Sequence, residues 1–341
     1  MKIAIIGVGL IGRERIIALK KISELTHQPI ELIAFDTNPE SLISVKVEYN
    51  IKITNDFNKI LSENPDWIFI CTPHYVAKDI VLKSFGSSAN ILLEKPFGCN
   101  IQECDEILTA KPVSSKLYIG FNYRFFDGIA MAINDIKNGR FGKLISVNLL
   151  LGHGNSPGME KSWKLDPIRC GGGCLIDPGI HILDLILQIS KGEISICGVK
   201  SWSGFWNTGI EEEVHLCFSD DKKTIFNMQV SLNRWRSTFR MEINGTDGYG
   251  IVEGRGRSYG PQSYRTGKRW GWQNAKSQID SENIEIASYD AEDSFLKEMV
   301  MLIMPELAER IFNHTIISKP CNSSQGREVM VLLDRCINLI K

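Results

Sequence analysis

Two residues, Lys95 and His181, are of types that polarise a hydroxyl or move its proton, and both stand in distinctive local sequences. Lys95 lies between Glu94 and Pro96, directly after the apolar run 90–93. A lysine at the end of a strand can hydrogen-bond a substrate hydroxyl and stabilise the negative charge that develops on its oxygen. A solvated lysine is the alternative interpretation, because this residue type is mostly exposed.

His181 lies in a run that begins with three glycines, 171–173, and continues through Asp177 and Asp184. If residues 176–190 form a helix, the two aspartates and the histidine share one face at i, i+4 and i+7. Histidine titrates near neutral pH without special tuning, so it suits a general base for alcohol oxidation. A histidine packed in the core is the alternative, and the neighbouring aspartate and triple glycine favour the functional interpretation.

The first twelve residues predict where a cofactor binds. Gly7, Gly9 and Gly12 form a G-x-G-x-x-G directly after the apolar run 2–6. The first glycine allows a tight turn from strand to helix, the second lets the backbone approach a pyrophosphate, and the third lets the helix pack closely on the strand. This spacing favours a dinucleotide held at the start of the helix.

The other elements that this motif requires follow in the sequence. Residues 11–22 have the pattern of an amphipathic helix, and 31–35 that of a second strand ending at Asp36, where an acidic residue binds the adenosine ribose. A carboxylate there repels a 2'-phosphate, and residues 37–39 contain no arginine to neutralise one. We therefore expect NAD rather than NADP. The alternative is an ordinary turn aspartate before a helix over 38–49.

Short apolar strands alternate with helical segments in the first third of the chain. Strand patterns cover 66–71, 90–93 and 116–121. This alternation predicts an α/β Rossmann domain with a doubly wound parallel sheet over residues 1–121. Its predicted cofactor-binding residues, which include the turn after the fourth strand, are Gly7, Gly9, Leu10, Ile11, Gly12, Asp36, Thr72, Pro73, His74, Glu94 and Lys95. The turn at 71–73 could equally be a plain strand terminator.

The pattern changes after residue 121. A helix is expected over 124–138, followed by long alternating stretches, which predict a mostly antiparallel open sheet. We therefore expect an α+β domain over residues 122–341 for substrate binding and oligomerisation. The alternating stretches are 145–151, 212–218, 224–232 and 239–244, and the last helical patterns are 290–313 and 325–340.

Composition excludes several classes of partner. The formal net charge is -1 and the sequence pI is about 6.6, which gives no basic footprint for nucleic acid. No segment reaches the roughly 18 unbroken apolar residues of a membrane span. The N-terminal apolar run is too short and too broken by glycine for a signal peptide. We expect a cytoplasmic protein with no nucleic-acid or membrane partner.

Nine cysteines are scattered through the chain, with no C-x-x-C pair and an odd total. Reduced thiols of this kind fit a cytosolic protein. Cys170 and Cys174, near His153 and His181, could be interpreted as zinc ligands. Their spacing matches no familiar zinc pattern, so no metal is expected.

Four motifs occur in order along the chain: the glycines of residues 7–12, Glu94-Lys95-Pro96, Gly-Phe-Asn-Tyr-Arg-Phe at 120–125, and the triple glycine leading to Asp177 and His181. With this set the chain resembles the Gfo/Idh/MocA family (glucose-fructose oxidoreductase, inositol dehydrogenase). The resemblance covers nearly the whole chain. It implies an N-terminal Rossmann domain, an open C-terminal sheet that often forms homodimer or homotetramer contacts, and redox chemistry on a sugar or polyol hydroxyl.

The resemblance also implies roles for single residues. By position in the motifs, Lys95 resembles the family's substrate-contacting lysine, Asp177 its substrate-positioning aspartate and His181 its acid/base histidine. Asn122 and Arg124 lie in the counterpart of the family's G-[FY]-N-x-R segment and are expected to bind substrate in the cleft. These five residues are the predicted catalytic and substrate-binding set.

One departure from the family concerns His74, which follows Pro73 directly, whereas many relatives carry a histidine a few residues later. The cofactor contacts at that edge are therefore expected to differ. The expected reaction passes a hydride between a secondary carbinol carbon and the nicotinamide of NAD, with His181 moving the hydroxyl proton and Lys95 polarising the oxygen. Two alternatives stay open: a redox-neutral glycoside cleavage or epimerisation, and an NAD-binding sensor without chemistry.

The segment 255–272 is compositionally unusual, because it interleaves basic and aromatic residues. Such a segment can clamp a phosphate or carboxylate while an aromatic ring stacks on a sugar or base, so a nucleotide sugar is a candidate substrate. An exposed loop or a subunit contact is the alternative, since interfaces favour the same residue types. The residues are Arg255, Arg257, Arg265, Lys268, Arg269, Tyr259, Tyr264, Trp270 and Trp272.

Overall fold

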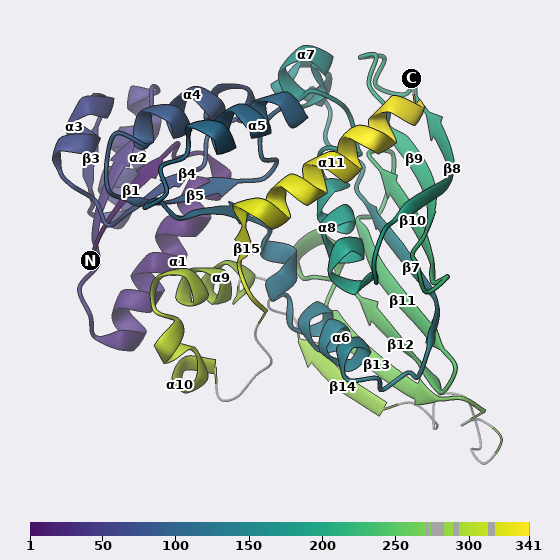
Figure 1. Cartoon of the computed structure of the whole chain (residues 1–341). Helices are drawn as coiled ribbons and strands as arrows, with labels where there is room; N and C mark the ends of the chain where they lie inside the picture. The colour runs from purple at the N-terminus through teal and green to yellow at the C-terminus, as the bar shows by residue number, and fades with distance from the viewer. Residues whose placement is uncertain (271–272, 274–282, 289–292, 313–317, 341) are drawn as a thin grey trace. The chain divides into compact units, whose positions relative to one another are not determined.

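The computed structural model describes residues 1–270, 273, 283–288, 293–312 and 318–340 (Figure 1). These residues separate into two compact units. The first holds residues 1–122 and two later segments that begin at Phe295 and Lys319, and the second begins at Tyr123 and takes the end of the chain from Leu332. The sequence assigned everything after residue 121 to the second domain, whereas packing places part of the C-terminal third with the first unit.

The first unit is built on a seven-stranded sheet with the order β15-β6-β5-β4-β1-β2-β3. All neighbours pair in parallel except β15, which pairs antiparallel with β6. The predicted doubly wound Rossmann sheet is therefore confirmed. The strands are β1 (Lys2–Ile6), β2 (Glu31–Phe35), β3 (Lys52–Thr54), β4 (Trp67–Ile70), β5 (Asn90–Glu94), β6 (Leu117–Gly120) and β15 (Cys321–Asn322).

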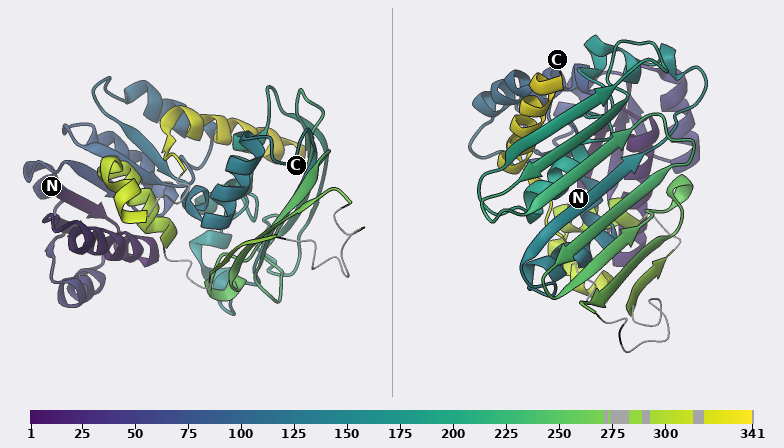
Figure 2. Two further views of the ribbon diagram at one scale, coloured as in Figure 1. Left: turned by 90° about the horizontal axis from the view of Figure 1, so that it is seen from below. Right: turned by 90° about the vertical axis from the view of Figure 1, so that its right-hand side faces the viewer.

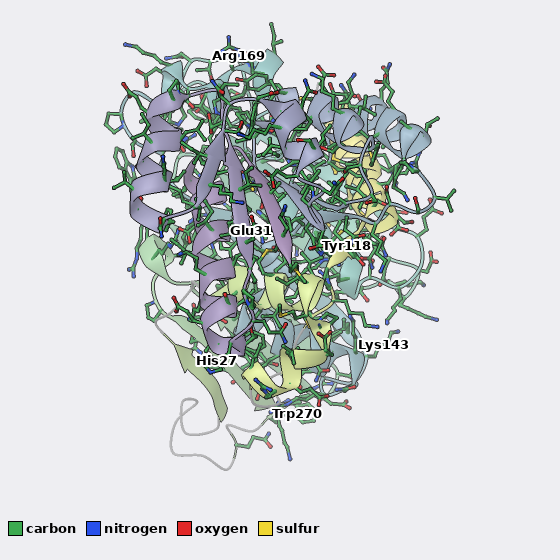
Figure 3. The ribbon with its side chains drawn as sticks, turned by 90° about the vertical axis from the view of Figure 1, so that its left-hand side faces the viewer. His27, Glu31, Tyr118, Lys143, Arg169 and Trp270 are labelled. Carbon is green, nitrogen blue, oxygen red and sulfur yellow. The ribbon has the colours of Figure 1, made fainter. Side chains whose placement is uncertain are left out.

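Helices lie on both sides of this sheet: Figure 1 shows α4 and α5 on one side and α1 and α9 on the other. Helix α2 starts where its sequence predicts, since Asn38 caps it by accepting from the Glu40 and Ser41 amides. Helix α1 ends at His27, which adopts a left-handed φ of 55° (Figure 3). The helices are α1 (Leu10–Thr26), α2 (Pro39–Tyr49), α3 (Phe57–Ser62), α4 (His74–Ser84), α5 (Ile101–Ala110), α9 (Asp293–Ile303) and α10 (Ala308–Phe312).

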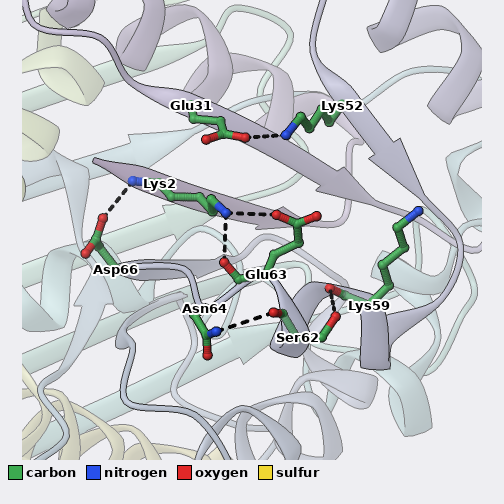
Figure 4. A network of polar contacts seen from close by, with 8 residues as sticks. All are labelled: Lys2, Glu31, Lys52, Lys59, Ser62, Glu63, Asn64 and Asp66. Carbon is green, nitrogen blue, oxygen red and sulfur yellow. Dashed lines mark hydrogen bonds and ion pairs between the residues drawn. The ribbon is translucent and has the colours of Figure 1, made fainter.

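A network of charged groups marks the amino ends of the parallel strands (Figure 4). The backbone amide of Lys2 donates to Asp66 at 2.7 Å, and its ammonium group donates to Glu63 at 2.8 Å. Glu31, at the start of β2, pairs with Lys52 at the start of β3. These pairs lie at the amino ends of the strands. The carboxyl ends, where open α/β sheets bind their ligands, are at the opposite end of the sheet.

The second unit contains an eight-stranded sheet with the order β14-β13-β12-β11-β7-β10-β9-β8. Only β7 and β10 pair in parallel, so the predicted mostly antiparallel sheet is confirmed. The strands toward its two ends, β8 on one side and β12 to β14 on the other, were not predicted from the sequence. The strands are β7 (Leu144–Gly152), β8 (Ser195–Trp202), β9 (Glu213–Ser219), β10 (Ile225–Ser231), β11 (Thr238–Gly245), β12 (Gly248–Glu253), β13 (Gln262–Lys268) and β14 (Asn283–Ser288).

One face of this sheet carries helices and the other is open (Figure 2). Side chains alternate along each central strand: in β9, for example, Val214, Leu216 and Phe218 are buried while His215 is exposed. This is the pattern of an antiparallel sheet with one covered face. The covering helices are α6 (Asp127–Lys137) and α8 (Ile180–Ile189), and the unit also contains α7 (Pro167–Cys170) and the end of α11 (Ser323–Ile340).

Two helix predictions need correction. The helix expected over 124–138 begins at Asp127, after a short 3-10 turn at Asn122–Phe125. The helix expected over 176–190 begins at Ile180, so Asp177 precedes it. The reason is local, because a residue before proline is disfavoured in the helical conformation and Pro178 follows this aspartate. Within the described residues no helix is long and apolar enough to cross a membrane.

A buried ion cluster holds the first unit together. The guanidinium of Arg15 on α1 is fully buried and lies 2.6 Å from Glu94 at the end of β5 and 2.5 Å from Glu298 on α9. Its carbon lies 4.7 Å from the ring centroid of Phe295. Two carboxylates also keep the guanidinium charged, since they raise the pKa of Arg15 against the opposing effect of its burial. Breaking such a pair leaves uncompensated buried charge, which destabilises strongly.

We predict that Arg15→Met lowers the free energy of unfolding by about 3–5 kcal/mol, because it leaves Glu94 and Glu298 buried without their cation. The matched control is Arg13→Met on the same helix, whose partially exposed pair with Glu48 contributes below about 1 kcal/mol. Urea unfolding of both variants tests the difference. Equal losses in the two variants would contradict a central role for the buried cluster.

Candidate active site

A cavity of about 490 Å³ lies at the carboxyl ends of the parallel strands in the first unit. It includes five of the predicted cofactor residues, and Leu10, Ile11, Gly12, His74, Glu94 and Lys95 are not among its lining. The other residues that line the cavity, such as Phe57 and Tyr75, were not predicted from the sequence. The complete lining is Gly7, Gly9, Phe35, Asp36, Thr37, Phe57, Cys71, Thr72, Pro73, Tyr75, Val76, Ile80 and Lys83.

The three glycines of the motif are required for different reasons. Gly7 has a φ of +90°, and a Cβ there would lie 2.9 Å from the Cys71 carbonyl. A Cβ on Gly12 would lie 2.0 Å from the Gly7 oxygen, so only glycine permits this close approach of helix to loop. A Cβ on Gly9 would meet no atom within 4 Å. Gly9 lines the cavity, and packing within the protein does not require glycine there. A ligand that approaches this backbone closely would require it.

Asp36 is held in place by the glycine loop. One carboxylate oxygen accepts from the Val8 amide at 2.8 Å and the other from the Asn38 amide at 2.9 Å. The carboxylate is therefore fixed at the mouth of β2 and lines the cavity, in the position expected of the residue that binds ribose hydroxyls.

Thr72 adds an independent sign that the cavity binds a polar ligand. Its hydroxyl oxygen is buried and has no hydrogen-bond partner among the described residues. Buried polar atoms are nearly always hydrogen-bonded, so an orphan in a cavity wall points to a group supplied by a ligand. Together with the glycine cradle and Asp36, this donor set fits a dinucleotide.

The Glu94-Lys95-Pro96 motif lies at the end of β5. Glu94 faces the protein interior, where it pairs with Arg15, and this differs from the cofactor contact expected from sequence. A Cβ on Gly120 would lie 2.8 Å from the Glu94 carboxylate, so the glycine leaves room for the ion pair. Lys95 is half-buried and is the first residue after the strand. Glu94 thus fixes the strand end from which Lys95 projects.

In the second unit, His181 lies in the first turn of α8 and is only 4% exposed. Its ring stacks on Tyr123, with centroids 3.9 Å apart and an interplanar angle of 13°. Burial raises the pKa of Tyr123, so this phenol stays protonated and cannot serve as a base near neutral pH. The stack fixes the orientation of the imidazole and leaves it the better candidate for proton transfer.

Asp177 lies outside the helix, and the single helical face expected for Asp177, His181 and Asp184 is therefore wrong. Its carboxylate instead lies 3.2 Å from the Lys164 ammonium, which raises the pKa of Lys164. Its charge also acts on Tyr123, the ring on which His181 stacks. Asp177 and His181 are therefore linked through Tyr123, and Asp177 is placed by a turn and not by helical spacing.

Asp184 and Arg124 form a buried ion pair in the second unit. The guanidinium donates to both carboxylate oxygens, with a shortest distance of 2.5 Å, and both side chains are almost fully buried. This pair joins the segment before α6 to α8, so Arg124 positions the histidine helix. Asn122, the other residue of that motif, belongs to the first unit and is half-exposed. A substrate contact for either residue stays a prediction.

The triple glycine is anchored by a residue that the sequence analysis missed, Glu211. Its carboxylate accepts from the Gly173 amide at 2.8 Å and the Leu175 amide at 3.3 Å. A Cβ on Gly173 would lie 2.0 Å from the Glu211 carbonyl oxygen, which explains the glycine. Burial raises the pKa of Glu211 above its usual value. This contact sets the start of the turn that carries Asp177.

The unusual segment 255–272 divides between different surroundings. Arg265 pairs with Glu253 at 2.6 Å across neighbouring strands, and Arg269 is exposed, donates to the Thr246 carbonyl and lies over Trp270. Arg255 instead lies over the rings of Tyr259 and Tyr123. Trp272 falls outside the described residues. Within the described chain, no group of three or more metal-ligating side chains occurs around Cys170 or elsewhere.

Two family models match consecutive parts of the chain. The one described as oxidoreductase family, NAD-binding Rossmann fold, matches residues 1–121, and the one described as GFO/IDH/MocA C-terminal domain matches residues 130–250. The chain belongs to the Gfo/Idh/MocA family. Its first unit is therefore an NAD-binding Rossmann domain, as the glycine motif predicted.

Relatives in the Gfo/Idh/MocA family support this assignment. Glucose-6-phosphate 3-dehydrogenase of Bacillus subtilis is 25% identical over 59% of this chain and 57% of its own length. A 2,7-anhydro-N-acetylneuraminate hydratase of Mediterraneibacter gnavus is 27% identical over 72% of this chain and 65% of its own. The chain thus spans less than two thirds of these relatives. The solved complex of levoglucosan dehydrogenase with NADH and levoglucosan shares the fold, with a TM-score of 0.81, 16% identity, and coverage of 99% of this chain and 96% of that one.

We predict that Thr72→Val weakens NADH binding by about 2–10-fold, the value of one hydrogen bond of 0.5–1.5 kcal/mol. Without cofactor, the melting temperature should stay the same or rise, because the substitution removes an unpartnered buried hydroxyl. Calorimetry with NADH and a thermal melt measure the two effects. Thr109→Val, on the exposed side of α5, is the control. Unchanged NADH affinity in Thr72→Val would show that the hydroxyl does not contact the cofactor.

Glu211 predicts a pH dependence of stability with a definite sign. Because the folded-state pKa is raised, the ionised form at neutral pH destabilises the fold, and this penalty disappears below the usual pKa of 4.5. Glu211→Gln should therefore melt at a higher temperature than the parent at pH 8, with the difference shrinking as the pH falls toward 4.5.

Glu213 supplies the opposite case as a control. Burial alone would raise its pKa, but hydrogen bonds from Ser231, Gln229 and His215 hold the pKa below its usual value. Glu213→Gln should lower the melting temperature at pH 8, and that loss should fade on acidification. The same pH trend in both variants would contradict the two assignments.

Proposed function

We propose that this protein is an NAD-dependent oxidoreductase that acts on a secondary hydroxyl or keto carbon of a sugar, polyol or nucleotide sugar. The observation that carries the proposal is the placement of His181, buried and stacked on Tyr123, in the unit that follows an NAD-binding domain of the Gfo/Idh/MocA family. A dinucleotide site alone would fit a sensor. An imidazole that is fixed by a ring, in the same unit as the Asp177–Lys164 pair, fits proton transfer.

Each proposed catalytic group has one task. His181 accepts the hydroxyl proton of the substrate during oxidation and returns it in the reverse direction. Lys95 donates a hydrogen bond to the same oxygen and stabilises the charge that develops on it. Asp177, which pairs with Lys164, orients the substrate by accepting a hydrogen bond from it. NAD, when bound, supplies the hydride acceptor, and Gly7, Gly9, Asp36 and Thr72 would hold it.

We propose NAD over NADP because the Asp36 carboxylate is fixed by two backbone amides and would repel a 2'-phosphate.

A second candidate function is a redox-neutral reaction in which the hydride returns to the same molecule. It is favoured by the M. gnavus relative, which is called a hydratase and matches 72% of this chain. Net NADH formation distinguishes the first function from the second.

We also propose a homodimer or homotetramer assembled through the open face of the eight-stranded sheet. That face has a hollow of about 580 Å³ that includes Leu150, Val199 and Cys217, and its last strand, β8, exposes Trp202. Light scattering on the purified protein would measure the mass of the assembly.

We also propose a cytoplasmic location. All nine cysteines are free thiols, which supports it.

The experiment that tests the function is a screen of sugars, polyols and nucleotide sugars for NADH formation with NAD and for the same reaction with NADP. With an active substrate, we predict that Lys95→Met and His181→Asn each lower kcat by about 10²–10⁴-fold, because each removes a proton-transfer or charge-stabilising group. His181→Asn should bind NADH as the parent does.

His27→Asn is the control, since this histidine is exposed at the end of α1, is not among the residues that line the cavity, and has a left-handed backbone that asparagine also tolerates. It should retain full turnover. Turnover by Lys95→Met or His181→Asn at the rate of the parent would overturn the assigned roles, and product without net NADH would select the redox-neutral function.

A further inference from the structure

Arg255 lies in a setting that a purely structural arginine does not need. Its guanidinium carbon lies 3.7 Å from the ring centroid of Tyr259, 5.0 Å from that of Tyr123 and 5.9 Å from that of Phe126. Its Nε atom is buried and has no hydrogen-bond partner in the part of the chain that the structure describes. Among the described residues, no carboxylate pairs with it.

The charges around it do not balance. Lys164 is matched by Asp177, and no counter-charge of this kind accompanies Arg255. Cation–π contacts with Tyr259 and Tyr123 offset part of the lost hydration of the guanidinium, but they do not satisfy the buried Nε–H donor. A cation with a buried and unsatisfied donor is expected to take an anion that accepts its hydrogen bond.

The loop that presents Arg255 has an unusual backbone conformation on both sides of it. Gly254, Gly256 and Gly260 have a positive φ, which glycine adopts without strain, and Arg257 has a φ of 50°, which strains a non-glycine residue. A Cβ on Gly254 would lie 2.0 Å from the Pro261 oxygen. Strained backbone of this kind persists where the surrounding structure enforces it, often at ligand-binding sites.

Arg255 is also linked to His181 through a shared ring. Tyr123 stacks on His181 at 3.9 Å and lies under Arg255, so one ring joins the proposed base to the unmatched cation. Both residues are in the second unit. A ligand that reaches the imidazole is therefore within a short distance of the guanidinium.

We propose that Arg255 binds an oxyanion carried by the substrate, a carboxylate or a phosphate, so that the substrate is an acidic sugar derivative. This rests on the proposed function, because it takes His181 as the group that meets the sugar. The planar guanidinium offers two parallel donors to such an anion, and the tyrosine rings hold it in one orientation.

Binding of three probes tests this inference by calorimetry in the presence of NADH: D-glucuronate, glucose 6-phosphate and D-glucose, with inorganic phosphate as a fragment. We expect at least one anionic probe to bind the parent more tightly than glucose, and Arg255→Met to weaken that probe by about 10–100-fold, the value of a charge-assisted hydrogen bond. The carboxylate and phosphate arms identify which oxyanion is preferred.

Arg269→Met is the matched control, because Arg269 also lies over an aromatic ring but is exposed. It should bind the probes as the parent does. Arg255→Lys keeps the charge without the planar donors and should show an intermediate loss. A thermal melt of each variant, compared with that of the parent, serves as the folding check.

Equal binding of the acidic and neutral probes, equal binding by Arg255→Met and the parent, or no binding of any anionic probe would overturn the inference. Failure of the proposed function looks different. Arg255-dependent anion binding without NADH formation from any sugar would contradict the dehydrogenase and leave the anion site. Oxidation of neutral sugars at the same rate by the parent and Arg255→Met would support the dehydrogenase and contradict the anion site.

Discussion

The first unit depends on one buried guanidinium. Arg15 lies on the helix that begins at the glycine loop, and its partners Glu94 and Glu298 come from the end of β5 and from α9. The same contact therefore ties the start of the cofactor site to the strand that ends beside Lys95 and to a segment about 280 residues further along the chain. A buried charge pair is weak evidence for net stability, but it strongly disfavours every arrangement in which the partners are separated. That selectivity is what a lysine at a strand end needs to keep a fixed position.

In the second unit, a buried ion pair and a ring stack together fix the position of His181. The buried pair of Arg124 and Asp184 fixes helix α8, and stacking on Tyr123 fixes the ring that the helix carries. Glu211 holds the triple glycine, and so the turn that places Asp177 beside Lys164. Three separate contacts thus fix the positions of the His181 imidazole and the Asp177 carboxylate. Sites built in this way keep their geometry without help from the ligand.

The sequence predicted what local pattern can encode. The strands of the parallel sheet and the glycine motif follow from apolar runs and from spacing, and β2 was placed to the residue. The positions of Asp184 and Arg124 could not be predicted, because their pairing joins residues 60 apart and spacing suggested a shared face with His181. The prediction that Asp177 lies in a helix failed for a different reason. Pro178 is evident in the sequence and disfavours the helical conformation of the residue before it. For the segment 255–272, composition left a substrate clamp and a subunit contact both open, since composition does not tell which side of a strand a residue faces.

Groups that lower the stability of the fold indicate where its ligands bind. The Thr72 hydroxyl and the Arg255 Nε are buried without partners, and Arg257 has a left-handed backbone. None of these features helps the chain to fold, and each is costly by itself. The first lies in the wall of the cavity in the NAD-binding domain, and the other two lie in the loop whose Arg255 packs over Tyr123, the ring on which His181 stacks. The proposed chemistry needs a bound molecule at both places. Satisfying such groups on binding adds affinity only for a ligand with the matching polar atoms, so the same features that weaken the fold would select the ligand.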